Sequence, residues 1–123
     1  MVNKEQVNMY LEFRKELDRI CVPKLLENSL TVIDIEDEGK RVGILCTDNN
    51  YIDCVYIFPE YRRKGLAKKA VLDWYNNRQE KYAQFHIINE NIVAKRFWES
   101  IFDLDIVEYD EICILYEVIG VKE

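Results

Sequence analysis

The chain has 123 residues, 49% of them hydrophobic, with 17 basic and 23 acidic side chains and a net charge of −6. A chain of this length can bury its own core without a metal or a disulfide, and its apolar content excludes intrinsic disorder. The acidic excess argues against a nucleic-acid or anionic-membrane partner, because both require a broad basic face. No apolar run approaches the ~20 residues that span a bilayer, and the amino terminus has no signal-peptide pattern. We therefore expect a cytoplasmic globular protein.

The chain has few residues that could build a metal site. Its four cysteines are Cys21, Cys46, Cys54 and Cys113, and its one histidine is His86. No two cysteines form a Cys-x-x-Cys pair, so neither a disulfide framework nor a zinc site is expected. Single cysteines within apolar stretches are typical of buried free thiols in a reducing compartment. The sequence thus predicts no metal.

The first half of the chain predicts a helix followed by three antiparallel strands. Apolar residues recur at helical spacing over residues 3–20, and Pro23 interrupts that pattern. From Leu30 the apolar residues alternate instead, which favours strands. The predicted strands are 30–37, 41–47 and 51–58, with turns at 37–40 and 48–50.

The second half predicts helices and strands in alternation, and then two closing strands. Pro59 ends the third strand, and an apolar stripe that begins at Leu66 indicates a helix. The predicted elements are helix 66–78, strand 82–88, helix 89–102 with an Asn cap, and strands 105–109 and 111–119. Because the chain shows no repeat and no linker, we expect a single α/β domain over residues 1–123.

A basic segment, residues 61–69 (YRRKGLAKK), holds five cations and no acid. It lies where the third strand leads into the second helix. A helix N-terminus presents unpaired N–H groups and partial positive charge, so Arg62, Arg63 and Lys64 beside it favour an anion such as a pyrophosphate. Gly65 would permit a tight turn and the close approach of a ligand. The spacing matches no nucleotide P-loop, and a solvated charge run is the alternative interpretation.

The wider sequence resembles the GNAT superfamily of N-acyltransferases. In its acetyl-CoA signature, a strand ending in hydrophobic-x-Pro leads into Arg/Gln-x-x-Gly-x-Gly/Ala and a helix. The matching positions are Val55, Ile57, Pro59, Arg62, Gly65 and Ala67. The family's second motif, Asn-x-x-Ala-x-x-apolar-Tyr, is matched at Asn91, Ala94 and Phe97. The resemblance covers about residues 30 to 118.

The resemblance implies a mixed, mostly antiparallel sheet, flanked by helices and split by a V-shaped cleft for acetyl-CoA. It implies that the pantetheine arm pairs with the third strand like an added strand. It also implies that main-chain N–H groups of residues 62–67 wrap the pyrophosphate. The cofactor-binding residues that it implies are Val55, Tyr56, Ile57, Arg62, Arg63, Lys64, Gly65, Leu66, Ala67, Asn91 and Phe97.

One departure from the family pattern concerns the proton donor. Trp98 stands where the family usually has Tyr, whose hydroxyl protonates the departing thiolate. An indole N–H donates a hydrogen bond but is no proton source near pH 7. A thiol with a pKa of about 8.5 leaves tolerably without an acid, so activity does not require the Tyr. Tyr109 and Tyr116 are alternative acids.

The reaction also needs a base, since an acceptor amine with a pKa of about 10.4 must lose a proton before it attacks. Asp53 is the candidate, with Asp48 and Tyr51 as alternatives. Asp53 lies two residues before Val55, so an unbroken strand would place both side chains on one face. A bulge would change that parity.

The sequence therefore predicts acetyl transfer from acetyl-CoA to the primary amine of a small molecule or a protein, by direct attack in a ternary complex. A non-catalytic GNAT-fold module that binds acyl-CoA is the alternative. A third hypothesis is a nucleic-acid or protein-binding domain that uses the basic segment. The family commonly opens with a strand, whereas this chain opens with the expected helix. We therefore expect an acceptor site that is more open, or that a partner chain completes in a homodimer.

Overall fold

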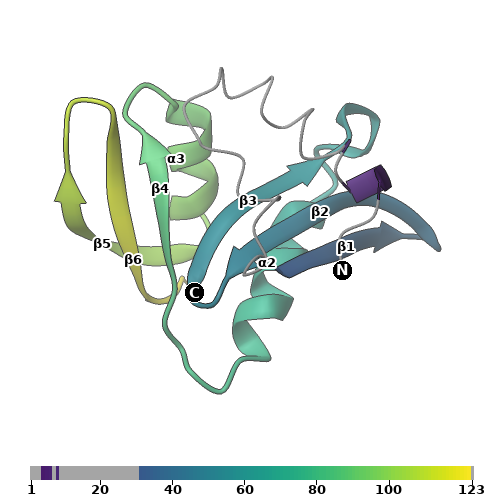
Figure 1. The fold of residues 1–123 in the computed structure, drawn as a ribbon, viewed down its shortest axis with the longest axis horizontal. Coiled ribbons are helices and arrows are strands. Elements are labelled where there is room, and N and C mark those ends of the chain that lie inside the picture. The colour runs from purple at the N-terminus through teal and green to yellow at the C-terminus, as the bar shows by residue number, and fades with distance from the viewer. Residues whose placement is uncertain (1–3, 7, 9–30, 123) are drawn as a thin grey trace. The chain divides into compact units, whose positions relative to one another are not determined.

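The computed structural model describes residues 4–6, 8 and 31–122. The chain divides into two compact units, Met1–Val71 and Leu72–Glu123 (Figure 1). Residues 4–6 and 8 are helical, in agreement with the helix expected near the amino terminus. The rest of that expected helix, Cys21 and Pro23 lie outside the described residues.

The first unit contains three antiparallel strands in chain order, as the alternating pattern predicts. β1 (Thr31–Asp37) pairs with β2 (Lys40–Asp48), and β2 pairs with β3 (Tyr51–Ile57). A two-residue turn joins β1 to β2, and in it Glu38 and Gly39 have φ angles of 52° and 80°. Left-handed conformations at both central positions are those that tight hairpins require, so the predicted turn at 37–40 is confirmed.

The middle strand, β2, fixes the position of β3. Every residue from 42 to 47 is buried, so β2 is covered on both faces. Gly43 lies opposite Ile57, and a Cβ atom on Gly43 would meet the carbonyl oxygen of Tyr56 at 2.1 Å. Only glycine allows so close an approach. β2 therefore holds the end of β3, from which the candidate site begins.

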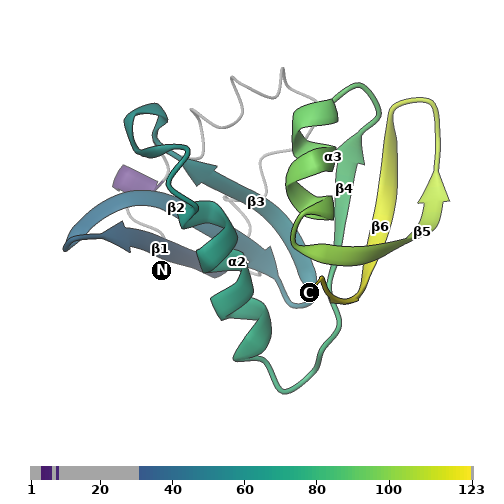
Figure 2. The same ribbon diagram turned by 180° about the vertical axis from the view of Figure 1, so that it is seen from behind.

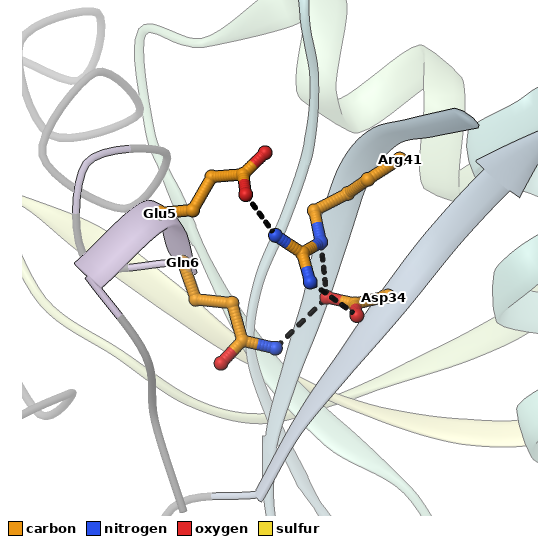
Figure 3. Close-up of polar contacts among 4 residues, drawn as sticks. All are labelled: Glu5, Gln6, Asp34 and Arg41. Atoms are coloured by element: carbon orange, nitrogen blue, oxygen red, sulfur yellow. Dashed lines mark hydrogen bonds and ion pairs between the residues drawn. The ribbon is translucent and has the colours of Figure 1, made fainter.

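A polar cluster joins the start of the chain to the β1–β2 hairpin (Figure 3). Two nitrogens of Arg41 lie 2.9 Å from the two carboxylate oxygens of Asp34, so the pair is bidentate. The Gln6 amide donates to the same carboxylate at 2.8 Å, and Glu5 pairs with Arg41 at 2.6 Å. Burial alone would raise the pKa of Asp34, but these hydrogen bonds and the Arg41 charge hold that pKa below its usual value.

The second unit is built on a sheet with β6 (Cys113–Val121) at its centre. β6 pairs antiparallel with β4 (Gln84–Ile88) on one side and with β5 (Phe102–Tyr109) on the other. Helix α3 (Ile92–Glu99) packs against one face of this sheet (Figure 2). At the hairpin between β5 and β6, the Asp110 carboxylate accepts from the N–H groups of the turn, which lowers the pKa of Asp110.

Helix α2 (Leu66–Asn76) begins in the first unit and ends in the second. It begins at Leu66, as predicted, and ends two residues before the predicted end. Lys81 closes it, because its ammonium donates to the carbonyl oxygens of Tyr75 and Asn76 at 2.9 and 2.8 Å. A cation at the helix C-terminus satisfies orphan carbonyl groups and opposes the negative end of the dipole.

The third predicted helix, 89–102, is shorter in the structure than its apolar pattern indicates. α3 begins at Ile92, because the side chain of Asn91 caps it, and ends at Glu99. Phe102 already belongs to β5. β5 begins three residues before the predicted strand 105–109, and β6 has the predicted length but lies two residues later than 111–119, since the sequence pattern does not show the ends of these strands. The predicted class, α/β with a mostly antiparallel sheet, is confirmed.

Candidate functional site

The main-chain groups of β3 alternate between the side that faces β2 and the opposite side. The Phe58 N–H donates to the carbonyl oxygen of Val42 at 2.9 Å, and Tyr56 lies opposite Ile44 in the same ladder. Antiparallel strands alternate between residues that bond to their neighbour and residues that point away. Val55 and Ile57 therefore direct their N–H and carbonyl groups away from β2, whereas Tyr56 directs its own toward β2.

The loop after β3 makes a sharp change of direction before α2. A 3-10 turn over Pro59–Tyr61 opens it, with the Tyr61 N–H donating to the Phe58 carbonyl at 2.9 Å. Arg63 and Gly65 then adopt left-handed φ angles of 66° and 76°. A non-glycine residue in this region is uncommon. Arg63 therefore carries backbone strain in the loop that the sequence indicates as a ligand loop. Residues with strained backbone are frequent at ligand sites.

The N-terminus of α2 is electropositive. The Gly65 carbonyl accepts from the N–H of Lys69 at 3.0 Å, so Gly65 is the capping residue and brings no side chain to satisfy the first-turn N–H groups. The first turn holds no acid, and Lys68 lies within it. Cations at a helix N-terminus oppose the dipole, so this arrangement favours an external anion. A Cβ on Gly65 would meet nothing within 4 Å, so the approach to these N–H groups is open on that side.

Of the cations in this loop, Arg62 is bound to the strand before it. Its Nε donates to the carbonyl oxygen of Ile57 at 2.8 Å, and its guanidinium lies 5.2 Å from the centre of the Tyr56 ring. The ammonium of Lys64 lies 5.6 Å from the ring centre of Tyr61. The side chains of Arg62, Arg63 and Lys64 are all exposed.

Asp53 is the extra residue of a β-bulge. Cys46 pairs with Cys54 and Thr47 pairs with Ile52, so Asp53 has no opposite residue in β2. Burial nevertheless alternates along β3, with Asp53 and Val55 both half-buried between buried neighbours. The interruption that the sequence could not place thus lies at the candidate base itself. Of the alternatives, Tyr51 and Asp48 face each other at the start of the strand pair.

Close to Asp53, the thiols of Cys46 and Cys54 are buried on paired positions of β2 and β3. A hydrogen bond with Cys46, burial and the negative charge of Asp53 together raise the pKa of Cys54. A thiol held in its protonated form is not a nucleophile. Cys46, Cys54 and Cys113 are free thiols, as predicted, although Cys113 is only half-buried.

In the second unit, Asn91 is the N-cap residue of α3, and Phe97 lies on this helix. The Oδ1 atom of Asn91 accepts from the Ala94 N–H at 3.0 Å. This cap uses the oxygen of the amide, and the two protons on Nδ2 take no part in it. Phe97 is half-buried, with its ring 5.0 Å from that of Trp98 in an edge-on arrangement.

Trp98 belongs to the aromatic core of its unit. It is 7% exposed, is stacked on Phe85 at 4.2 Å and lies nearly parallel to Phe102 at 6.4 Å. The two alternative acids differ from each other, since Tyr109 is exposed and Tyr116 is buried with its ring 6.1 Å from Phe85. The partners of Trp98 lie on β4 and β5, which the local sequence around Trp98 could not show.

Two further observations concern function classes. The described part of the chain holds no group of three or more His, Cys, Asp or Glu side chains that could bind a metal ion. Among the described residues, no helix has both the length and the apolar character needed to cross a bilayer.

A mostly antiparallel α/β fold, with an outward strand edge and an acid-free cationic helix N-terminus after it, defines a protein suited to an extended, phosphorylated cofactor. A sequence model of the Acetyltransferase (GNAT) family matches residues 3–103. The chain belongs to this family and is an N-acetyltransferase that uses acetyl-CoA as its acetyl donor. No curated protein sequence matches the chain.

Solved structures with the same fold are distant in sequence. The apo form of YjaB from Escherichia coli matches with a TM-score of 0.64 at 16% identity, over 95% of this chain and 90% of that one. The PaiA N-acetyltransferase from Thermoplasma acidophilum, in complex with coenzyme A, matches with a TM-score of 0.60 at 14% identity, over 96% and 80%. A chimera of spermidine N-acetyltransferase SpeG from Vibrio cholerae and hSSAT matches with a TM-score of 0.63 at 13% identity, over 95% and 93%.

Proposed function

We propose that this N-acetyltransferase transfers the acetyl group directly to a primary amine in a ternary complex, and that both units act together as one domain over residues 1–123. The observation that carries the cofactor site is the N-terminus of α2. Its first turn lacks an acid, contains Lys68 and follows three exposed cations. Without an anion this arrangement is unfavourable, whereas a pyrophosphate turns the charges of Arg63, Lys64 and Lys68 into favourable interactions.

The proposed cofactor contacts follow from the chemistry of each position. Main-chain N–H groups of Gly65, Leu66 and Ala67 bind the pyrophosphate, with Arg63 and Lys64 supplying charge. The outward main-chain groups of β3 pair with the amides of the pantetheine arm. The resemblance also implies Tyr56, but its main-chain groups point toward β2, so it is not proposed to bind a pantetheine amide. We extend the proposal to Asn91 and Phe97, which the family motif marks.

The bound thioester supplies an acetyl group attached to a good leaving group. The residues of this chain then have two tasks. The Asp53 carboxylate takes the proton of the acceptor amine, directly or through water. An N–H on the outward edge of β3 donates to the carbonyl oxygen of the thioester, where negative charge develops. Trp98 stands at the usual acid position of the family, and the thiolate leaves without a dedicated acid.

For the acceptor, we propose a cationic amine, in a small molecule or in a protein. The net charge of −6 favours the approach of a cation. A related fold is that of a spermidine N-acetyltransferase chimera, and another was solved with a bisubstrate analogue that joins CoA to a short peptide. A panel of polyamines, peptide α-amines and lysine-containing peptides, assayed by thiol release, distinguishes these acceptor classes. Release with none of them would contradict the proposed reaction.

Binding is tested separately from turnover. Acetyl-CoA at 100 times its dissociation constant should stabilise the fold by about 2.7 kcal/mol, seen as a raised unfolding temperature. Coenzyme A should do the same, while pantetheine, which lacks the pyrophosphate, should have a much smaller effect. The absence of any shift at millimolar acetyl-CoA and coenzyme A would sink the proposed site.

The homodimer also stays a proposal. Several apolar side chains of the β5–β6 region are more than 45% exposed: Ile106, Val107, Tyr109, Ile112 and Ile119. Light scattering coupled to size-exclusion chromatography measures the assembly directly, and a monomer with full activity would exclude the need for a partner chain.

A further inference from the structure

Arg62 is the one loop cation whose guanidinium is held from two sides by a single strand. Its Nε donates to the main-chain oxygen of Ile57 at 2.8 Å, and its guanidinium lies over the Tyr56 ring at 5.2 Å. Both contacts belong to the last two residues of β3. Tyr56 is 4% exposed and lies edge-on to Phe58 at 5.9 Å, so the surface under Arg62 is itself fixed.

The direction of the Ile57 carbonyl gives this contact its importance. The ladder with β2 turns the main-chain groups of Ile57 to the outward edge, the same edge that the proposed pantetheine arm would use. Because this oxygen accepts a hydrogen bond from Arg62, it already has a partner in the loop. The outward groups that are left for the cofactor amides are those of Val55 and the N–H of Ile57.

We propose that Arg62 is a positioning residue that fixes the phosphate loop to the end of β3, and that its planar N–H donor rather than its charge performs this role. The inference rests on the proposed cofactor site and deepens it. The contact spans the turn at Pro59–Tyr61 and sets where the strained loop begins, and the left-handed Arg63 and Gly65 follow directly. Fixing the loop before binding reduces the entropy lost when the phosphates bind.

Two substitutions of Arg62 separate the effect of its N–H donor from the effect of its charge. In R62Q the amide nitrogen stands the same number of bonds from Cα as the Nε of arginine, so it can donate to the Ile57 oxygen without any charge. In R62K the charge is kept, but the nitrogen lies one bond farther and the planar group over Tyr56 is lost. R62A removes both features.

The experiment measures the affinity for coenzyme A by titration calorimetry. We expect R62Q to bind within about threefold of the wild type, and R62K and R62A to bind about tenfold more weakly, as the loss of one hydrogen bond implies. Any other order overturns the proposal. In particular, retained binding in R62K with loss in R62Q would make Arg62 a phosphate ligand through its charge.

Arg63 provides the matched control, because it is the neighbouring exposed cation and the described residues show no contact between its side chain and β3. R63K should retain affinity and R63Q should lose it, which is the reverse of the order at position 62. The salt dependence provides a readout that a general loss of stability would not change. Removing a charge that acts on the phosphates flattens the dependence of affinity on salt, so R63Q should flatten it and R62Q should not. A flattened dependence in R62Q contradicts the proposed role.

Hydrogen exchange of the cofactor-free protein tests the same contact without the cofactor. Over residues 58–66, R62A and R62K should exchange faster than the wild type, and R62Q should not. Equal exchange in all four proteins would overturn the positioning role. If the wild type fails to bind coenzyme A, the proposed function fails, and the exchange result still decides whether Arg62 holds the loop.

Discussion

The indole of Trp98 stacks on the ring of Phe85 at 4.2 Å with an angle of 25° between the two planes. The stack joins the motif helix α3 to strand β4 inside the second unit. It means that the residue at the family's usual proton-donor position also carries part of the core. Loss of packing and gain of a hydroxyl are therefore expected together when Trp98 is changed.

Trp98→Tyr should lower the free energy of unfolding by about 1–3 kcal/mol, because tyrosine leaves part of the indole volume empty. Chemical denaturation measures this. Trp74→Tyr is the control, since Trp74 is only half-buried, with Arg78 4.5 Å over its ring, and should cost less than ~1 kcal/mol. An equal loss in both variants would show that the stack adds nothing specific.

The same variant tests the proton-donor hypothesis. Among folded molecules, we expect turnover of Trp98→Tyr to rise, or its alkaline limb to shift, with little change in acetyl-CoA affinity. A general acid typically raises the rate about 10²–10⁴-fold, and we expect the lower end of this range because a thiol is already a good leaving group. Thiol release at several pH values gives the answer. A fall in turnover with the fold and the affinity intact would mean that the indole itself shapes the site.

Gly65→Val should abolish coenzyme A binding while leaving the protein folded. Valine resists a φ of 76° and would place its side chain in the open space beside the α2 N-terminus. Gly39→Val is a matched control, because Gly39 has a φ of 80° and equally open surroundings in the β1–β2 turn.

Both glycine variants should lose about 1–2 kcal/mol of stability from backbone strain. Only Gly65→Val should lose cofactor affinity, measured by calorimetry on the folded protein. Normal affinity in Gly65→Val would remove Gly65 from the proposed phosphate loop.

Gly43→Ala should be strongly destabilising, although alanine has the better strand propensity. The new methyl group would lie 2.1 Å from the Tyr56 oxygen and 3.0 Å from the Ile57 Cα, so main chain would have to move. We expect a loss of about 2–4 kcal/mol by denaturation. Gly120→Ala, where nothing lies within 4 Å, should be neutral or slightly stabilising. Similar values for the two would contradict the close approach of β3 to β2.

Asp34 should make stability depend on acid pH. Its folded-state pKa lies below the unfolded value of about 3.9. The contribution is therefore complete above that unfolded pKa and is lost as the pH falls through the folded pKa. Asp34→Asn should remove this part of the dependence, so its stability should fall less than that of the wild type between pH 7 and pH 2, in denaturation curves at both values.

Asp105→Asn is the control for this pH dependence. Asp105 is exposed, and the described residues show no ion pair or hydrogen bond of its side chain. Its pH profile should follow that of the wild type. A profile for Asp34→Asn that is as steep as the wild type's would show that the Asp34–Arg41 pair contributes nothing to stability.

By itself, the sequence determined the class of the fold, the position of the cofactor motif and the order of the elements in residues 31–122, with element boundaries that differ from those of the structure by up to three residues. Alternation and turn residues predict β1 to β3 because side-chain period and turn chemistry are local properties. The proposed phosphate loop could be located in the sequence for the same reason, since the Gly65 turn, the cations and the start of α2 are neighbours in the chain.

Tertiary structure alone decided the features that depend on residues far apart or on the direction of single groups. The bulge at Asp53 comes from pairing with β2. The requirement for glycine at position 43 comes from the main-chain oxygen of Tyr56 on the next strand. The stack of Trp98 on Phe85 depends on how α3 packs against β4. The Arg62 contact joins near neighbours, yet no sequence period encodes which way the Ile57 carbonyl points, because the β2 ladder sets that direction.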